Sequence, residues 1–222
     1  MDAHRERALI QSNGTSSELL YLRAIRELSS VEGPVLDLGC GQGALLRLLR
    51  TAGVRELVGC DGFRHADGLQ SEGIEFVQAD LNEALPFAAA SFSAVCALEV
   101  IEHLENPRHF MREISRILKP GGMTIVSTPN NESVTSALSL LGRGHFSAFA
   151  DACYPAHITP VLRIDLLRIL NETGFDRSEV IWTDSGRMPR SDRHWQTISR
   201  RLFKGRLFSD NFLAKGIKRN AS

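Results

Sequence analysis

A short stretch of the sequence brings together side chains that can bind protons or metal ions. Glu99 and Glu102 are followed by His103, and His157 lies further along the chain. Carboxylates and imidazoles are hard or borderline ligands, which suit Mg, Mn, Fe or Zn. The pattern therefore indicates a catalytic site in which these four residues hold a divalent metal. Without a metal, Glu102 or His103 would be a general base, and in the plainest interpretation both only bind nearby backbone groups.

A glycine-rich turn forms a second candidate site. Gly39-Cys40-Gly41-Gln42-Gly43 follows the apolar run 34–38, and glycine lets a backbone turn sharply or approach a ligand closely. Asp61 follows the turn at close to the ~20-residue spacing at which a carboxylate can accept hydrogen bonds from ribose hydroxyls. Asp80, after the next apolar run, could accept from the exocyclic amine of adenine. The turn predicts a nucleotide site, and a tight turn without a ligand is the alternative.

Strands and helices are expected to alternate along the chain. Apolar runs predict strands at 34–38, 57–61, 74–80, 92–98, 123–128, 179–183 and 211–217. Helical spacing and caps predict helices at 44–50, 107–118 and 159–173, and a first helix that starts at the capping box Thr15-x-x-Glu18. The apolar face of that first helix is expected to consist of Leu19, Leu22, Ile25 and Leu28. This alternation predicts an α/β fold with a mostly parallel sheet.

Ligands of such sheets bind beyond the carboxyl ends of the strands. The glycine turn, Asp61, Asp80, Glu99 and Asn130 all follow predicted strands, which favours one common site. We expect a helical segment at 1–30, a core at 31–184 and a basic extension at 185–222. A loop-rich insertion at 131–158 is expected within the core.

Several motifs resemble those of class I S-adenosylmethionine-dependent methyltransferases. The first is the run from Val35 to Gly43, and the later ones are Ala79-Asp80-Leu81, Leu85-Pro86-Phe87, 91–95 and 118–122. The resemblance implies a Rossmann-like sheet of seven strands with helices on both faces. It also implies that the cofactor's methionine part is held by Asp37, Gly39, Cys40, Gly41 and Gly43, its ribose by Asp61 with Gly62, and its adenine by Asp80 with Leu81.

The group Glu99-x-x-Glu102-His103 is similar to that of ubiquinone-biosynthesis O-methyltransferases, which methylate catechol-like rings. Small-RNA 2′-O-methyltransferases share the group and a downstream histidine. The resemblance implies O-methylation of a small or lipid-linked molecule, such as a quinone precursor or a saccharide, with an RNA methyltransferase as the alternative. Asn130, His145 and His157 are candidates for contact with the acceptor.

Two functions of other classes are weighed against methyl transfer. A nicotinamide-dependent dehydrogenase would carry Gly-x-Gly-x-x-Gly, whereas this turn has Gly-x-Gly-x-Gly. A methyltransferase-like subunit that binds the cofactor or a partner protein without turnover would not need every motif intact. The intact motifs of this sequence argue against that function.

Composition narrows the class of protein. The chain has 222 residues, of which 43% are hydrophobic and 23% charged, which excludes a wholly disordered chain. A formal net charge of zero argues against a globally basic nucleic-acid binder. No apolar run approaches the roughly 18 residues that cross a bilayer, and the charged N-terminus lacks a signal-peptide pattern. We expect a cytoplasmic protein with reduced cysteines.

The zero net charge hides a basic C-terminal region. Residues 185–222 contain ten lysines and arginines but only Asp192 and Asp210 as acids. Within it, Trp195, Ile198, Leu202 and Phe203 fall near helical spacing among basic residues. A basic amphipathic helix at 195–206 could lie on an anionic membrane, which would make the protein peripheral. Alternatively its apolar face packs on the sheet. The scarcity of nearby aromatic residues makes nucleic acid a less favoured partner.

Overall fold

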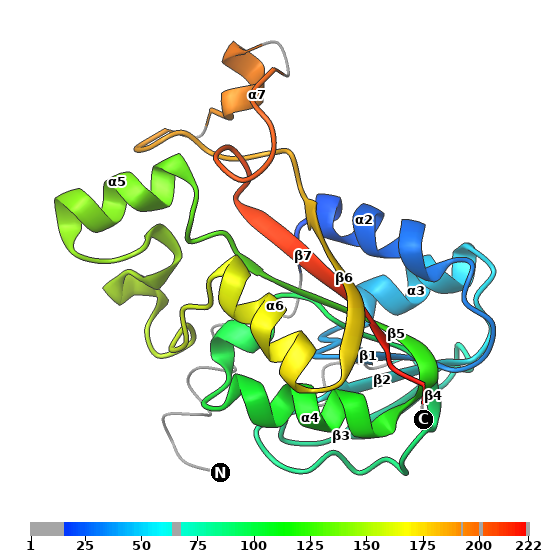
Figure 1. Ribbon diagram of the computed structural model, residues 1–222. Helices are drawn as coiled ribbons and strands as arrows, with labels where there is room; N and C mark the ends of the chain where they lie inside the picture. The colour runs from blue at the N-terminus through cyan, green and yellow to red at the C-terminus, as the bar shows by residue number, and fades with distance from the viewer. Residues whose placement is uncertain (1–15, 64–67, 192, 200–201, 221–222) are drawn as a thin grey trace.

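The computed structural model describes residues 16–63, 68–191, 193–199 and 202–220. Its centre is a seven-stranded sheet with the order β3-β2-β1-β4-β5-β7-β6 (Figure 1). The first five strands pair in parallel, and β7 runs antiparallel to both β5 and β6. The strands are β1 (Val35–Leu38), β2 (Leu57–Asp61), β3 (Glu75–Gln78), β4 (Phe92–Ala97), β5 (Leu118–Pro129), β6 (Phe175–Trp182) and β7 (Asn211–Lys218). The predicted seven-stranded α/β fold is confirmed.

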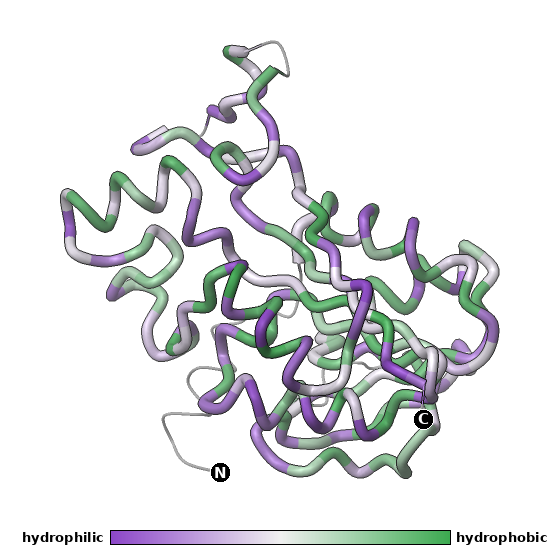
Figure 2. The backbone as a smooth tube through the Cα atoms, viewed as in Figure 1, coloured by the Kyte–Doolittle hydropathy of each residue, from purple (hydrophilic) through white to green (hydrophobic). Residues whose placement is uncertain are grey.

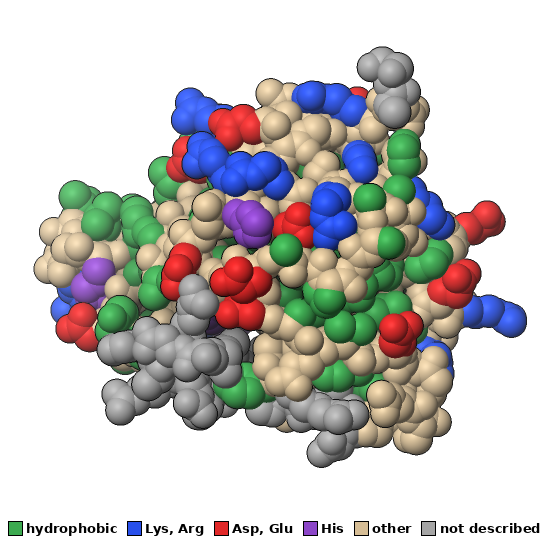
Figure 3. Space-filling view, turned by 90° about the horizontal axis from the view of Figure 1, so that it is seen from below, with side chains coloured by type: hydrophobic (Ala, Val, Ile, Leu, Met, Phe, Trp, Pro, Cys, Tyr) green, Lys and Arg blue, Asp and Glu red, His purple; other side chains and the backbone are tan. Residues whose placement is uncertain are grey.

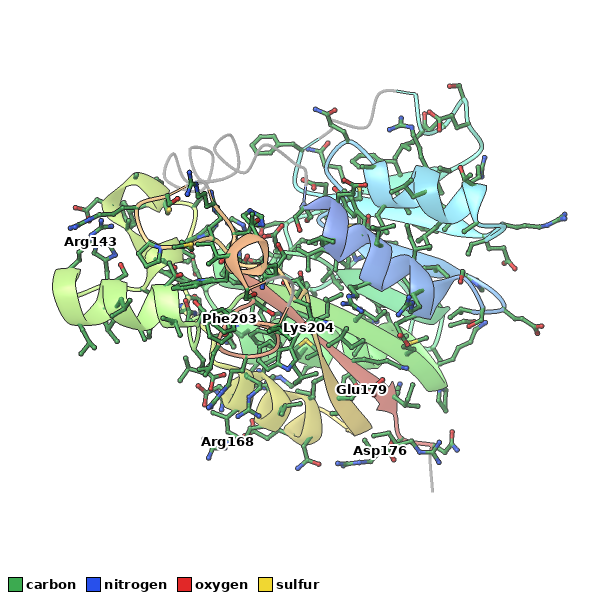
Figure 4. The ribbon with its side chains drawn as sticks, turned by 90° about the horizontal axis from the view of Figure 1, so that it is seen from above. Arg143, Arg168, Asp176, Glu179, Phe203 and Lys204 are labelled. Carbon is green, nitrogen blue, oxygen red and sulfur yellow. The ribbon has the colours of Figure 1, made fainter. Side chains whose placement is uncertain are left out.

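Helices cover both faces of this sheet. Helices α2 (Glu18–Leu28) and α3 (Ala44–Thr51) pack on one face, and α4 (Pro107–Ile117) and α6 (Arg163–Glu172) on the other. Figure 4 shows the strands lying between these two layers. Asn106 caps α4 as expected, with its side chain accepting from the His109 N–H, and proline occupies the first turn. The two apolar layers hold the carboxyl ends of β1, β2 and β4 together at one edge.

Helix α2 differs from its prediction in cap and in buried face. Ser17 is the N-cap, because its side chain accepts from the Leu20 N–H, whereas Thr15 lies outside the described residues. The buried residues are Leu20, Ala24 and Leu28, whereas Leu19 and Leu22 are exposed. Both sets fit a helical period, so the sequence pattern could not choose between them. The packing partner of the helix decides which face turns inward.

The expected loop-rich insertion contains a regular helix. Helix α5 (Val134–Arg143) starts at the Ser133 cap and ends at Gly144, and two short 3-10 turns follow at Ser147–Phe149 and Asp151–Cys153. Figure 1 shows α5 projecting from the body of the molecule, and Figure 2 shows hydrophobic residues along it. Leu141 is 84% exposed. In Figure 3 apolar side chains gather on this projecting lobe.

The C-terminal region is tied to the rest of the molecule. Only one helical turn, α7 (Trp195–Ile198), forms in the described part of the expected helix at 195–206. Trp195 contacts the rings of Phe203 and Phe208 instead of the sheet. Several basic side chains find acids elsewhere in the chain: Lys215 lies 2.7 Å from Glu27, and Arg206 lies 3.5 Å from Glu132. The charge asymmetry of the sequence is therefore partly neutralised by folding.

No helix among the described residues is both long enough and apolar enough to cross a membrane. This agrees with the sequence, in which apolar runs are short.

Candidate active site

The glycine turn joins β1 to α3 and has the backbone shape that only glycine adopts readily. Gly39, Gly41 and Gly43 have φ values of +71°, +50° and +78°. A Cβ on Gly39 would lie 2.4 Å from Cγ2 of Val100, so the turn is also too close to its neighbour for a side chain. Cys40, within the turn, is buried in the core. The turn thus presents backbone rather than side chains at the end of β1.

Two acids surround this turn. The Asp61 carboxylate accepts from the Gly41 N–H at 2.9 Å and from the Phe63 N–H at 3.0 Å. Asp37 is buried beneath the turn, and its burial, with the charge of Asp61 as a smaller cause, raises its pKa to about 8. A cationic group placed beside Asp37 would favour its charged form. Asp61 holds the turn in place and is itself half-buried at the strand end.

The remaining predicted cofactor residues lie beyond β2 and β3. Gly62 follows Asp61, and its carbonyl accepts from the Gln78 side chain at 3.0 Å. Asp80 follows β3, and its carboxylate accepts from the Asn82 N–H at 2.9 Å. Leu81 is 9% exposed and belongs to the core. All these residues lie at the carboxyl edge of the sheet, as the sequence predicted.

Three potential metal ligands meet after β4. One ligand atom of each of Glu102, His103 and His157 can be chosen so that all lie within 4.8 Å of one another. The rings of His103 and His157 have centroids 4.8 Å apart. The carbonyl of Glu102 accepts from the N–H groups of Ile158 and Thr159, each at 3.0 Å, which fastens the end of the insertion here. This clamp places His157 beside residues more than fifty positions earlier in the chain.

Both histidines have one ring nitrogen committed to the backbone. Nδ1 of His103 lies 2.8 Å from the carbonyl oxygen of Ala156, and Nδ1 of His157 lies 2.7 Å from that of Ala148. A carbonyl can only accept, so in the neutral His157 ring the proton lies on Nδ1 and the lone pair on Nε2. The His103 ring also interacts with the backbone of Glu99, and this bond and the one to Ala156 both oppose the lowering of its pKa. Burial, and then the charge of His157, lowers the pKa of His103 to about 4. Burial likewise lowers the pKa of His157, so both rings are neutral at neutral pH.

Glu102 is fully buried, and neither carboxylate oxygen has a partner in hydrogen-bond geometry, although its own backbone N–H and the Thr128 hydroxyl lie near enough to oppose the rise of its pKa. Burial raises its pKa to about 8, and the charge of Glu99 contributes less. Such a group is costly to leave unpaired in the folded protein.

Glu99 lies apart from this cluster, although the sequence placed it among the metal ligands. Its backbone has a φ of +53°, which is rare for a residue with a side chain, and its N–H donates to Ser127 Oγ at 2.9 Å. Burial raises the pKa of its carboxyl, which hydrogen bonds from Ser16, Ser17 and Asn211 partly offset. Glu99 therefore faces the start of α2 and β7.

A large cavity of about 1240 Å³ opens beside the cluster, between α5 and residues 183–194. Glu99 and His157 line it, so the predicted acceptor residue His157 belongs to both cavity and cluster. Asn130 also lines the cavity, but its buried amide donates to the carbonyls of Arg206 and Ser209 and accepts from the Glu132 N–H. His145 is not among the lining residues, and its Nδ1 lies 3.0 Å from the Phe146 carbonyl oxygen.

Sequence reasoning missed the part that α5 plays in this cavity. Thr135, Ser139 and Arg143 line it at four-residue spacing, and Arg187 and Arg190 line it from the opposite side. The spacing of the first three was a readable signal for one helix face.

The strand order and the glycine turn with its acids define a class I S-adenosylmethionine-dependent methyltransferase domain. A family model described as a methyltransferase domain matches residues 1–180. The chain belongs to this family of methyltransferase domains. The match sets aside the alternative of a nicotinamide-dependent dehydrogenase.

Named relatives are more distant. The mitochondrial ubiquinone biosynthesis O-methyltransferase of Dictyostelium discoideum is 32% identical over 124 residues, covering 49% of this chain and 39% of that protein. The ubiquinone biosynthesis O-methyltransferase of Xanthomonas oryzae pv. oryzae is 27% identical over 171 residues, covering 69% and 70%. The chain spans less than half the length of several relatives that it matches.

Solved structures share the fold. A methyltransferase from Archaeoglobus fulgidus has a TM-score of 0.67 at 21% identity, covering 94% of this chain and 97% of that one. A possible histamine N-methyltransferase from Thermotoga maritima has a TM-score of 0.66 at 19% identity, covering 90% and 89%. At these identities the likeness concerns the fold alone.

Proposed function

We propose that this protein transfers the methyl group of S-adenosylmethionine to a hydroxyl oxygen of a small or lipid-linked acceptor, such as a catechol-like quinone precursor or a saccharide, with a divalent metal at Glu102, His103 and His157. The observation that carries the proposal is this cluster, which adjoins the acceptor-sized cavity at the edge where the glycine turn lies. The similarity to ubiquinone biosynthesis O-methyltransferases supports an oxygen acceptor.

The cluster fits a metal by the chemistry of its donors. The two unpartnered oxygens of Glu102 are buried, and a cation would satisfy them. Each histidine is held through Nδ1 by a backbone carbonyl, which is the outer hydrogen bond that orients metal-binding imidazoles. A bound divalent ion would lower the pKa of an acceptor hydroxyl and so favour its nucleophilic form.

We propose the donor site at the glycine turn, at the same carboxyl edge of the sheet. Backbone groups of the turn from Gly39 to Gly43, with Asp37, would hold the methionine part of the cofactor, and Asp61 its ribose. The adenine would lie by Asp80 and Leu81. S-adenosylmethionine supplies an electrophilic methyl group, and the protein's task is to align the acceptor oxygen with it. Glu99 lines the cavity, and its proposed role is to orient the acceptor.

An acceptor panel tests the proposed function. Purified protein is incubated with S-adenosylmethionine and Mg²⁺, Mn²⁺, Fe²⁺ or Zn²⁺, and with catechol, 3,4-dihydroxybenzoate, a phenyl glycoside or a short RNA. We expect methylation at oxygen of a catechol or a saccharide, detected by mass spectrometry together with the demethylated cofactor. Methylation at nitrogen or carbon would contradict the oxygen acceptor. Methylation of the RNA alone would favour the 2′-O-methyltransferase alternative.

We also propose that the basic C-terminal region contacts an anionic membrane surface. Leu202 is 83% exposed and Ile198 is 56% exposed, close to Lys204. Binding to vesicles with phosphatidylglycerol is expected to weaken as the salt concentration rises. Lys204→Glu should weaken this binding, whereas the control Arg55→Glu, which is distant in sequence from residues 195–206, should not. Sedimentation with vesicles measures this. Equal binding to neutral vesicles, or none to either kind, would leave only a packing role for residues 195–206.

A further inference from the structure

The cavity has a basic outer part that the proposed chemistry leaves unexplained. Besides His157 and Cys153, the ionisable side chains that line it are Arg143, Arg187, Arg190 and His194, against the two acids Glu99 and Asp210. Asp210 already accepts from the Arg187 N–H at 3.0 Å and lies 3.6 Å from its guanidinium. The surplus of positive charge favours an anion here.

Two of these arginines have no acid partner within the described part of the chain. Among the described residues, neither Arg143 nor Arg190 forms an ion pair, whereas Arg163 and Arg206 both reach Glu132. Both unpaired side chains are exposed, Arg143 at the end of α5 (Figure 4) and Arg190 on the segment across the cavity. Guanidinium groups bind oxyanions through paired N–H donors.

A buried hydroxyl on the same helix face points to a ligand independently of the charges. Ser139 is 9% exposed, and its Oγ has no hydrogen-bond partner in the described part of the chain. It lines the cavity one helical turn before Arg143. A hydroxyl left without a partner is costly, and a ligand oxygen would satisfy it.

We propose that this cavity binds an acceptor that carries an oxyanion, a phosphate or a carboxylate, held by Arg143, Arg190 and Ser139. The hydroxyl to be methylated then lies at the inner end, by Glu99 and His157, and the anion lies toward the mouth. Leu138, Met188 and Pro189 line the same cavity and offer apolar surface to the body of the acceptor. The inference rests on the proposed function in treating the ligand as the methyl acceptor.

Calorimetry with two small anions that are both mostly dianionic at pH 8, inorganic phosphate and malonate, tests the proposal at that pH and low ionic strength. The double variant Arg143→Gln with Arg190→Gln is expected to bind the preferred anion about tenfold more weakly, the scale of losing charge-assisted hydrogen bonds. Arg112→Gln is the matched control, because Arg112 is exposed, forms no ion pair with any described residue and does not line the cavity. Whichever anion binds more tightly identifies phosphate or carboxylate as the group recognised.

Ser139→Ala separates a ligand contact from a structural role. The free protein makes no use of this hydroxyl, so we expect weaker anion binding without any loss of thermal stability. The proposal would be overturned if neither anion bound the wild-type protein. It would also be overturned if the double variant and the control bound the preferred anion equally well. Affinity for S-adenosylmethionine is measured on the same samples. A protein that does not bind S-adenosylmethionine would contradict the proposed function. Anion binding does not depend on S-adenosylmethionine, so the two failures can be told apart.

Discussion

Chelation of divalent ions is expected to abolish methyl transfer, and Glu102→Gln is expected to abolish metal binding while it stabilises the metal-free protein. The carboxyl of Glu102 is buried with no partner, and its pKa is raised to about 8. A group whose pKa is raised on folding binds more protons in the folded state, so it makes stability fall as pH rises from its unfolded value toward 8. The neutral amide of glutamine removes this penalty.

The expected gain at pH 8 and above is about 1 kcal/mol, or about 2–4 °C in Tm for a chain of this size. Metal content, turnover and melting in EDTA measure the three effects, with Glu83→Gln as an exposed control. Metal affinity should rise with pH, since Glu102 must lose its proton and His103, with its pKa near 4, is already neutral. Full turnover by metal-free protein in EDTA would remove the metal from the mechanism. A Glu102→Gln protein that is less stable yet keeps its metal would show that this carboxyl has only a structural role.

Asp61→Ala is expected to weaken binding of S-adenosylmethionine by about 1.5–3 kcal/mol, the scale of a hydrogen bond to a charged group. The carboxylate is proposed to bind the ribose, and it supports the glycine turn through the Gly41 N–H. Asp61→Asn separates these contributions, because its carbonyl can still accept from Gly41 while its charge is lost. Calorimetry with the demethylated cofactor measures both variants.

The control for the Asp61 variants is a measurement of whether each variant is folded in the absence of ligand. Chemical unfolding shows whether the turn has collapsed in Asp61→Ala, and only a folded variant informs on binding. Unchanged affinity in a folded Asp61→Ala protein would exclude Asp61 from the cofactor site. An Asn variant with wild-type affinity would assign Asp61 to support of the turn alone.

Local sequence signals predicted the elements that pack at the centre of the sheet. The short apolar run 57–61 predicts a buried strand, and its bounds agree with β2. Helix α5 was missed because residues 131–158 lack a clear apolar period, which follows from its projecting position: Leu138, Leu140 and Leu141 are all exposed. A helix that buries little of its surface has no apolar stripe from which the sequence could predict it.

The sequence predicted those parts of the site whose residues lie close together along the chain. It did not predict how residues that are distant in sequence come into contact. The glycine turn and Asp61 follow from a spacing within one βαβ unit. Glu102 and His157 meet because backbone N–H groups of Ile158 and Thr159 bind the Glu102 carbonyl, and backbone hydrogen bonds leave no trace in residue type. The same lack of signal explains why Glu99 was grouped with ligands from which its backbone turns it away.

The position of β7 between β5 and β6 also sets an order of events during synthesis. Thr124 of β5 pairs with Gly216, and Val180 of β6 pairs with Ala214, so each of these strands waits for a partner translated later. Until β7 leaves the ribosome, β5 presents an open edge and β6 has no neighbour in the described sheet. Open edges are templates for wrong pairing, and contacts so distant in sequence form slowly. From the synthesis of β5 until that of β7 the nascent chain therefore carries an incomplete sheet, and shielding of the β5 edge during that interval would protect it from wrong pairing.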